Sequence, residues 1–600
     1  MLLFFAAAFT PACSDMLDVV NENEVDVTQH YNTAGDADNA ILAIYGKMMG
    51  LVDRLIVLGE LRADLMDITP NATFDMAAIS SHTATAANEY CNVAPFYEVI
   101  LNCNDALTNF DKMLEEKKMS NADYRHRYAD VATVRCWIYL QLAIHFGSIP
   151  YVTEPLTTVA ELKRAQFSPK SFDEILQLLI ACMEGLPSKG LSTASPLYDV
   201  TIDGYFTRML FLNKYFVLGD LYLWADRYVD AAAQYYAVID EAERLFFSGN
   251  EKVAYKLDGW VWAGSNEPKF QVCYVRYKDQ DQNSFRNKWK EIFSRTSTDS
   301  ELRQEMITMW SYNPSFAPRY PLVEIFANTG LGEYRLKPSE YAIDLWENRQ
   351  TQTNGFVYDG RGKEASFDYV NGQPVVIKYL YDYYSRTIDA NRTIHLDYNS
   401  LENEFAVQGK WFVQRAALLH LRYAEAANRA GYPDLAYALL NDGIFTSYNW
   451  SMEDGSKRAD NNISGVQYTG YKPASDNSLS LPYPSPFYLD ARMSNSATPY
   501  FRSPWRDNYG IRRRASLTNV EKPDWVINQA DSIRWLEESL LVEAALECGF
   551  EGHRWGDMLR IAMRKNRDNG SGTLYINDLM GKAKSIPALT PETWFLTTKE

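Results

Sequence analysis

A pair of small residues twelve positions apart constrains the fold of this 600-residue chain more than any other feature. Gly219 lies within a run of large apolar residues at helical spacing. Ala231 lies in a second helix, expected over residues 228–239. Small side chains at these points let two antiparallel helices approach closely, while the large side chains fill the space around the crossing.

The same arrangement returns about two hundred residues downstream. Ala424 lies in an expected helix over residues 418–430, and Ala436 lies in another over residues 434–441. The intervening Gly-Tyr-Pro at 431–433 breaks the helix. A helix-turn-helix unit that recurs in this way is typical of tetratricopeptide-like repeats, which stack into a curved scaffold. The sequence therefore predicts a mainly α protein.

Further helices are indicated by apolar periodicity and by their end signals. Ser171 can cap a helix, and Glu174 three residues later completes a capping box. We expect helices over residues 36–49, 94–114, 130–146 and 171–186, and a final long helix from 532–545 that continues through Glu547 toward Arg560.

Between the two repeat units the pattern becomes irregular, with short β-like runs at 269–277 and 373–379. A second stretch, rich in Gly, Ser, Pro and Asn, covers 451–507. Loops this long inside a compact domain are usually functional or disordered. We therefore expect one helical part over 36–250, an insertion over 251–404, and a second helical part over 405–600 that carries the 451–507 excursion.

The N-terminus has the composition of an export signal. Residues 2–9 form an apolar run too short to cross a bilayer as a helix. Small residues and then Cys13 follow, which predicts a lipoprotein signal over 1–12, lipidation of Cys13 and an acidic tether over 13–35. A frayed apolar end of a soluble protein is the competing interpretation.

The formal net charge of −18 makes nucleic acid a poor partner, because a negative surface repels phosphate. The sequence has no H-E-x-x-H, G-x-S-x-G, G-x-G-x-x-G or P-loop motif. None of the seven cysteines forms a C-x-x-C pair, so we expect no metal site and no cofactor. A bridge between Cys91 and Cys103 stays open.

Four residues near the C-terminus could form an acid–base cluster: Glu551, His553, Arg554 and Asp557. A catalytic role would need a nucleophile or a water site nearby, and no spacing indicates one. We favour a structural role in which Arg554 binds a buried carboxylate such as Glu547 or Glu425 and ties the last helix to the scaffold.

Several segments, taken in order, give the chain a family resemblance. They are Cys13 followed by Ser-Asp-Met-Leu-Asp; Arg135-Cys-Trp-Ile-Tyr-Leu-Gln-Leu-Ala-Ile-His-Phe-Gly-Ser-Ile-Pro150; Ser171-Phe-Asp-Glu-Ile-Leu; Leu421-Arg-Tyr-Ala-Glu-Ala426 with Leu440-Asn441; and Glu543, Glu547 and Phe550-Glu-Gly-His-Arg-Trp-Gly-Asp-Met-Leu-Arg560. The chain resembles the SusD/RagB nutrient-binding lipoproteins of Bacteroidetes. The resemblance covers the helical parts and leaves out the insertion and the excursion.

The resemblance implies a SusD-like fold of about four tetratricopeptide-like helix pairs that support a variable ligand-binding face. It also implies a lipoprotein at the cell surface of the outer membrane, seated over a SusC-like TonB-dependent transporter. Such a protein would capture oligosaccharides, or peptides in some members, and would have no catalytic activity.

A sugar site combines exposed aromatic rings, which stack on sugar C–H faces, with polar side chains that bind hydroxyls. Aromatic residues make up 14% of the chain, so core packing competes with ligand binding for each ring. As a group, the candidates are Asn71, Phe74, Asn88 and Tyr90 in an early loop, and Trp260, Trp262, Asn283, Asn287, Trp289, Trp310, Tyr312 and Asn313 in the insertion.

Two other classes of function stay open. A tetratricopeptide array commonly binds protein segments in its concave face, which would make the chain an interaction scaffold. A hydrolase on a helical frame would need two carboxylates about 5–10 Å apart in a cleft, and no spacing in the sequence singles out such a pair.

Overall fold

The computed structural model describes residues 31–156, 167–190, 197, 201–202, 205–246, 255, 257, 288–294, 305–313, 317–381, 383–388, 394–398, 409–448, 484–487 and 508–598. Within these residues the chain is mainly helical, as predicted. The longer helices are α1 (Ala34–Met49), α4 (Ala94–Glu115), α5 (Asn121–Phe146), α7 (Phe172–Glu184), α8 (Lys214–Trp224), α9 (Tyr228–Phe246), α14 (Ala416–Arg429), α18 (Gln529–Cys548), α19 (Arg554–Asn569) and α20 (Gly572–Gly581).

Shorter helical elements connect them. These are α2 (Val52–Ile56), η2 (Val57–Leu61), α3 (Phe74–Ser80), η3 (Glu89–Cys91), η5 (Thr207–Leu210), α10 (Lys288–Ser294), α12 (Leu322–Phe326), α13 (Glu340–Glu347), α15 (Pro433–Leu440), α16 (Gly443–Tyr448) and α17 (Ile511–Arg514).

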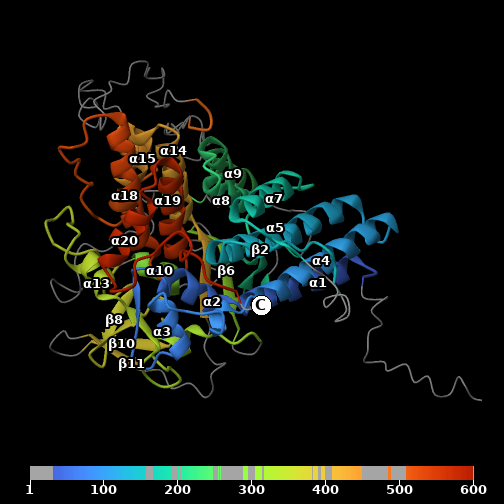
Figure 1. Ribbon diagram of the computed structural model, residues 1–600, viewed down its shortest axis with the longest axis horizontal. Helices are drawn as coiled ribbons and strands as arrows, with labels where there is room; N and C mark the ends of the chain where they lie inside the picture. The colour runs from blue at the N-terminus through green and yellow to red at the C-terminus, as the bar shows by residue number, and fades with distance from the viewer. Residues whose placement is uncertain are drawn as a thin grey trace, which may run out of the picture.

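Neighbouring helices pack in sequence order through most of the molecule. Each helix in the series α4, α5, α7, α8, α9, α14, α15 and α18 contacts the next one. Figure 1 shows this succession, with α4 and α5 on one side of the molecule and α18 and α19 on the other. The arrangement is a stack of helical hairpins, which confirms the predicted scaffold.

The small residues of the repeat pattern lie where the helices cross. Gly219, Ala231, Ala424 and Ala436 are all buried. A Cβ atom added at Gly219 would lie 2.6 Å from Cε1 of Tyr235, so the α8–α9 crossing has no room for a methyl group. The ring of Tyr235 fills the space, and its hydroxyl donates to Asp220 at 2.6 Å.

Local end signals set several helix boundaries. The Ser171 hydroxyl accepts from the Glu174 N–H, and the Glu174 side chain accepts from the Ser171 N–H, so the predicted capping box is present at α7. Helix α5 ends at Gly147, whose φ of 72° lies in the left-handed region that glycine tolerates.

The predicted continuous helix from 532 toward 560 is wrong. Helix α18 ends at Cys548, and α19 begins only at Arg554. In the turn between them Phe550 has φ 71° and Gly552 has φ 94°. The Phe550 ring is fully buried and lies 5.5 Å from the ring of Trp346, so burial of this side chain offsets the backbone cost at a non-glycine residue.

The strands are short and form separate two-stranded antiparallel sheets. They are β1 (Met66–Ile68) with β7 (Leu336–Pro338), β2 (Ile149–Pro150) with β3 (Pro169–Lys170), β4 (Thr201–Ile202) with β5 (Tyr205–Phe206), β6 (Met306–Tyr312) with β12 (Gly409–Arg415), β8 (Phe367–Val370) with β9 (Gln373–Val376), and β10 (Tyr384–Ile388) with β11 (Ile394–Tyr398).

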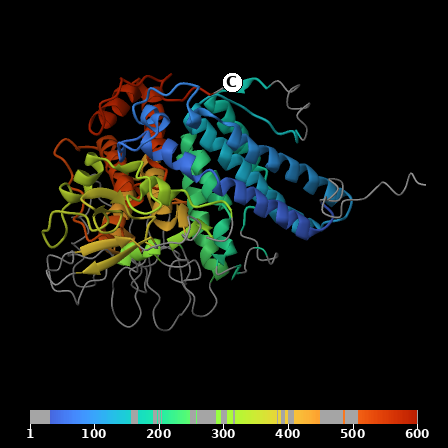
Figure 2. The ribbon, with the colours of Figure 1, turned by 90° about the horizontal axis from the view of Figure 1, so that it is seen from below.

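The insertion packs against the scaffold along the β6–β12 pair, where Trp310 lies opposite Trp411. Seen from below, the yellow-green insertion covers the end of the molecule beneath the C-terminal helices, while the blue N-terminal helices project to one side (Figure 2). Buried apolar residues from both parts form a single hydrophobic core. Of the two expected β-like runs, the one at 373–379 contains β9 at its start, and the one at 269–277 lies outside the described residues. Most of the 451–507 excursion lies outside them as well.

Candidate functional site

Three aromatic residues expected to contact a ligand are core residues instead. Trp289 and Trp310 are both 0% exposed, and Tyr312 is buried as well. Trp310 packs edge-on against Trp411 with ring centroids 5.1 Å apart. The Tyr312 hydroxyl donates to the Met49 carbonyl at 2.7 Å. These side chains offer no surface to a sugar ring, so the expectation is corrected for all three. Asn313, which follows Tyr312, is half-buried.

The early loop divides into exposed and supporting residues. Phe74, the first residue of α3, is 88% exposed, and Asn71 just before it is exposed too. Asn88 and Tyr90 are buried beneath the loop, contrary to the expectation of direct contact. The Asn88 amide donates to the Asp75 carbonyl at 2.9 Å, which holds the start of α3 in place.

A contact with the insertion fixes the other side of this loop. The Asn71 amide donates to the Glu333 carbonyl at 3.0 Å, and β1 pairs with β7 a few residues away. The exposed Phe74 ring is therefore carried by a well-anchored segment. Cys13, Trp260, Trp262, Asn283 and Asn287 lie outside the described residues.

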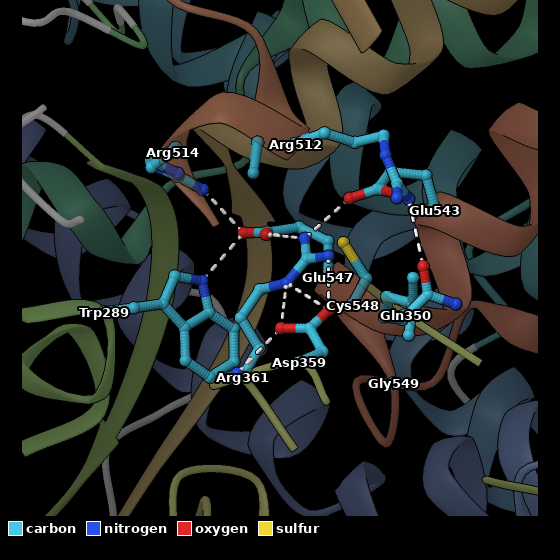
Figure 3. Close-up of polar contacts among 12 residues, drawn as sticks. Trp289, Gln350, Asp359, Arg361, Arg512, Arg514, Glu543, Glu547, Cys548 and Gly549 are labelled. Carbon is cyan, nitrogen blue, oxygen red and sulfur yellow. Dashed lines mark hydrogen bonds and ion pairs between the residues drawn. The ribbon is translucent and has the colours of Figure 1, made fainter. Parts of the chain in front are cut away.

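The most extensive polar feature is a buried ion network, shown in Figure 3. It centres on Glu547 of α18, which accepts hydrogen bonds from Arg415 at 2.8 Å, Arg514 at 2.6 Å and Arg361 at 2.7 Å. The indole N–H of Trp289 also donates to Glu547, at 3.0 Å. Trp289 therefore has a structural role in the core.

The network balances its charges in a site closed to water. Five cations, Arg361, Lys378, Arg415, Arg512 and Arg514, face five carboxylates, Glu305, Asp359, Glu543, Glu547 and Glu551. Burial alone would raise the pKa of Glu547, but Arg514, Arg415 and Arg361 outweigh it and hold that pKa well below its ordinary value. The carboxylate stays ionised and cannot serve as a general acid at neutral pH.

This network connects three regions that are distant in the sequence. Arg361 and Lys378 belong to the insertion, Arg415 ends β12, and Glu547 and Glu551 close α18 and the following turn. Removal of one partner from a buried pair leaves an uncompensated charge, so the insertion and the scaffold are energetically linked.

The C-terminal Phe-Glu-Gly-His-Arg-Trp segment joins the last helices to the N-terminal part of the chain through ion pairs. Arg554 forms a two-pronged pair with Asp64, with both N–O distances at 2.7 Å. Its structural role is as predicted, but the expected partners Glu547 and Glu425 were wrong; Glu425 instead pairs with Arg560 at 2.6 Å. Asp64 precedes Arg554 by 490 residues, and no local pattern indicates that pairing.

Glu551, which begins the candidate acid–base cluster, is committed to the ion network. It accepts from Arg415 at 2.9 Å and from Lys378 at 2.9 Å. Burial opposes ionisation of Glu551, but Arg415 and Lys378 lower its pKa overall. Asp557 is paired with Arg422 and with Arg560. The carboxylates of this cluster are therefore engaged in ion pairs that hold helices together.

A small cavity lies between α5, α8, α14 and α19. Its volume is about 50 Å³, and three indoles line it, those of Trp137, Trp224 and Trp411. The polar wall includes Gln141, Arg422 and His553. This space has room for a few water molecules and is far too small for an oligosaccharide. Within the described residues, no cluster of three metal-ligating side chains is found.

Four histidines and one glutamate predict how stability changes with pH. Burial lowers the pKa of His82 to about 3, of His420 and His553 to about 4, and of His145 well below its ordinary value. Between pH 4 and 6.5 the unfolded chain therefore binds more protons, and stability falls as pH falls. Burial raises the pKa of Glu60 to about 7, which has the opposite effect. Each group contributes at most about 1.4 kcal/mol per pH unit.

His126 acts in the same direction as these imidazoles, whereas Asp53, Asp130, Asp220 and Asp359, whose pKa burial raises, act in the same direction as Glu60. We therefore state the expectation for one ring: between pH 6.5 and pH 5 the urea midpoint of the parent chain should drop more, or rise less, than that of His553→Gln. This substitution removes one titrating ring and should leave the midpoint at pH 8 nearly unchanged. Urea unfolding followed by circular dichroism at several pH values tests this. The same change of midpoint with pH in both proteins would contradict it.

Comparisons with known proteins connect this geometry to a class. No protein-family model matches the chain, and no curated protein sequence matches it. Solved structures do match over nearly the full length. A SusD superfamily protein from Bacteroides thetaiotaomicron is 15% identical, covers 93% of this chain and 98% of its own, and superposes with a TM-score of 0.53.

Two further structures carry names that describe a ligand. Surface glycan-binding protein A from Bacteroides uniformis is 14% identical, covers 94% of this chain and 96% of its own, and has a TM-score of 0.52. A laminarin-binding SusD-like protein is 13% identical, with the same two coverages, 94% and 96%, and a TM-score of 0.50. The predicted SusD-like fold is thus confirmed. In the described part of the chain, no helix has the length and apolarity needed to span a membrane.

Proposed function

We propose that this chain is a cell-surface binding lipoprotein that captures oligosaccharides and delivers them to a TonB-dependent transporter in the outer membrane. The observation that carries the proposal is the likeness of fold, over 94% of this chain, to a surface glycan-binding protein and to a laminarin-binding protein. The charged residues near the C-terminus are engaged in structural pairs, which fits binding better than turnover.

Among the described candidates, Phe74 and Asn71 are the residues with surface to offer a ligand. Phe74 presents a ring that a sugar can stack on, and Asn71 stands three residues before it on the same loop. Contacts from Asn88 below and from the Glu333 carbonyl beside the loop hold it in place, so a ligand would not have to order it. We assign these two residues to the ligand-binding face.

Calorimetry with a defined panel tests the function. The chain without residues 1–13 is titrated with laminarin, starch, xylan, mannan and pectin fragments, and with mixed peptides. Binding of a glycan supports the proposal, and binding of peptides alone supports the peptide-capturing alternative. If a folded protein binds no member of the panel, glycan capture and peptide capture are both overturned, and an interaction scaffold is favoured. New reducing ends after incubation would show hydrolysis and overturn the binding-only function.

Replacement of the exposed ring should weaken glycan binding specifically. We expect Phe74→Ala to lower affinity about tenfold, which is about 1.4 kcal/mol, because a stacked ring contributes on that order. Phe74→Trp should retain most of the affinity. Ile527→Ala is a matched control, since Ile527 is 78% exposed but lies in the loop before α18. Equal affinities for Phe74→Ala and the parent chain would remove Phe74 from the site.

Anchoring and transfer are tested separately. Labelled palmitate should enter the parent chain but not Cys13→Ala, and the parent chain should co-purify with an outer-membrane barrel. A neighbouring gene for such a transporter would support the transfer step independently.

A further inference from the structure

One hairpin of the insertion turns on an exposed Asn-Gly pair. Asn371 and Gly372 connect β8 to β9, and the flanking residues Val370 and Gln373 pair with each other. The φ angle is 53° at Asn371 and 75° at Gly372, so both residues of this two-residue turn are in the left-handed region. A turn of this kind is type I′, and Asn-Gly is its preferred sequence. Strand β8 lies at the end of the molecule opposite α15 (Figure 1).

An Asn-Gly pair carries its own reaction partner. The backbone nitrogen of the glycine attacks the side-chain carbonyl carbon of the asparagine, because a glycine has no side chain that hinders the approach. Hydrogen bonds to the nitrogen or to the side-chain amide must break first, and this slows the reaction. The sequence contains three such pairs, which begin at Asn354, Asn371 and Asn569, and all three asparagines are exposed.

The pair that begins at Asn354 is held at both reacting groups. The backbone N–H of Gly355 donates to the carbonyl oxygen of Gln352 at 2.9 Å. Oδ1 of Asn354 accepts a hydrogen bond from the backbone N–H of Phe356 at 3.1 Å. The attacking nitrogen and the attacked amide are therefore both engaged.

The pair that begins at Asn569 is held in the same way at the end of α19. The backbone N–H of Gly570 donates to the carbonyl oxygen of Asn566 at 3.0 Å and closes the last turn of the helix. Oδ1 of Asn569 accepts a hydrogen bond from the backbone N–H of Ser571 at 3.0 Å. Two hydrogen bonds would again have to break before the ring could close.

The pair in the β8–β9 turn is free at both points. Within the part of the chain that the structure describes, neither the backbone N–H of Gly372 nor the side chain of Asn371 has a hydrogen-bond partner. Space does not distinguish the three pairs, since nothing lies within 4 Å of a Cβ atom added at any of their glycines. Hydrogen bonding does distinguish them.

We propose that Asn371 is a site of spontaneous deamidation in the folded protein and reacts ahead of Asn354 and Asn569. A base such as hydroxide removes the proton from the nitrogen of Gly372. This nitrogen attacks Cγ of Asn371, a C–N bond forms, and the side-chain nitrogen takes a proton from water and leaves as ammonia. Water then opens the cyclic imide at one of its two carbonyl carbons. Opening at the side-chain carbon gives aspartate, and opening at the main-chain carbon gives isoaspartate.

Both products change the turn. Each adds one negative charge at neutral pH, and isoaspartate also places the side-chain methylene in the main chain, so the two-residue turn no longer fits the strand register. Two contacts anchor the hairpin beside the turn: Asn328 Nδ2 donates to the Val370 carbonyl at 2.7 Å, and the Tyr334 hydroxyl donates to the Pro374 carbonyl at 2.8 Å. A changed register would loosen these contacts. The inference does not depend on the proposed function.

The test compares the three asparagines within one sample. The full chain is incubated in detergent at mildly alkaline pH and digested at acidic pH. The peptides are mapped by mass spectrometry, with isoaspartate separated from aspartate by chromatography. We expect Asn371 to convert about tenfold faster than Asn354 or Asn569, which corresponds to about 1.4 kcal/mol in the barrier. A rate at Asn371 that does not exceed the other two rates overturns the proposal.

The same measurement in urea separates the effect of the fold from that of the sequence. Glycine follows all three asparagines, so their rates should come close together once the hydrogen bonds of the folded chain are lost. If Asn371 keeps the same lead in the unfolded chain, the folded geometry is not its cause, and the proposal is overturned.

Two matched substitutions connect the reaction to the charge of the intact protein. Asn371→Gly keeps a residue that accepts the left-handed turn, so this variant should fold like the parent chain. It should lose most of the acidic species that isoelectric focusing shows after incubation, whereas Asn354→Gly should retain them. Acidic species that persist in Asn371→Gly contradict the assignment. If this variant fails to fold, as judged by circular dichroism, the peptide map of the parent chain decides.

Discussion

Glu547→Gln should destabilise the folded protein by about 3–5 kcal/mol, one of the two largest single-residue effects that we expect. Glu547 accepts hydrogen bonds from Arg361, Arg415 and Arg514, and all four side chains are buried. A neutral amide of the same shape leaves one buried positive charge without compensation. The amide NH2 of the new glutamine would also face the N–H donors of the arginines, so these donors would lose their acceptor.

Urea unfolding measured by circular dichroism gives the free-energy difference. Glu538→Gln is the matched control, because Glu538 lies on the same helix with an exposed side chain, and it should change stability by less than about 0.5 kcal/mol. The indole of Trp289 reports the site directly, since its N–H donates to Glu547. Similar midpoints for the two variants would mean that the network contributes little.

Gly59→Ala should destabilise the protein by about 3 kcal/mol or more, because two backbones meet at this position. Gly59 lies in η2, and an added Cβ would lie 2.1 Å from the carbonyl oxygen of Gly552. The approach is fixed from the other side as well, since Glu60 accepts from the Gly552 N–H at 2.7 Å. A methyl group would separate η2 from the turn before α19.

The control is a glycine in an ordinary helix. Gly46 lies in α1, and nothing lies within 4 Å of an added Cβ. Gly46→Ala should therefore stabilise the protein by about 0.5–1 kcal/mol through helix propensity. Thermal and urea unfolding of both variants give the comparison. If Gly59→Ala behaves like Gly46→Ala, the turn and η2 do not require their close approach.

The scaffold was predictable from sequence because its signals are local. The capping box of Ser171 and Glu174 lies within one helical turn, and the spacing of Gly219 and Ala231 records a crossing of consecutive helices. The break before α19 was missed, because the positive φ of Phe550 depends on its packing against Trp346, about two hundred residues away. Tertiary contacts overrode the helical periodicity there.

The ligand site was less predictable, and the reason is also physical. A tryptophan carries the same sequence signal whether it faces solvent or the core. Trp289 is buried, and its indole N–H donates to Glu547, which is 258 residues away in the sequence. One signal could have helped for Trp310: the apolar run over 306–312 has the composition of a buried strand, and it pairs with β12. The sequence around Phe74 carries no local signal that its ring is exposed. The domain boundaries remain predictions.

The pair between Asp64 and Arg554 has a consequence for how the protein is made. Because its partners are separated by 490 residues, the N-terminal part cannot complete its core until nearly the whole chain has left the ribosome. A chain that ended before Arg554 would keep Asp64 buried without its partner, so we expect such a chain to lack a complete core.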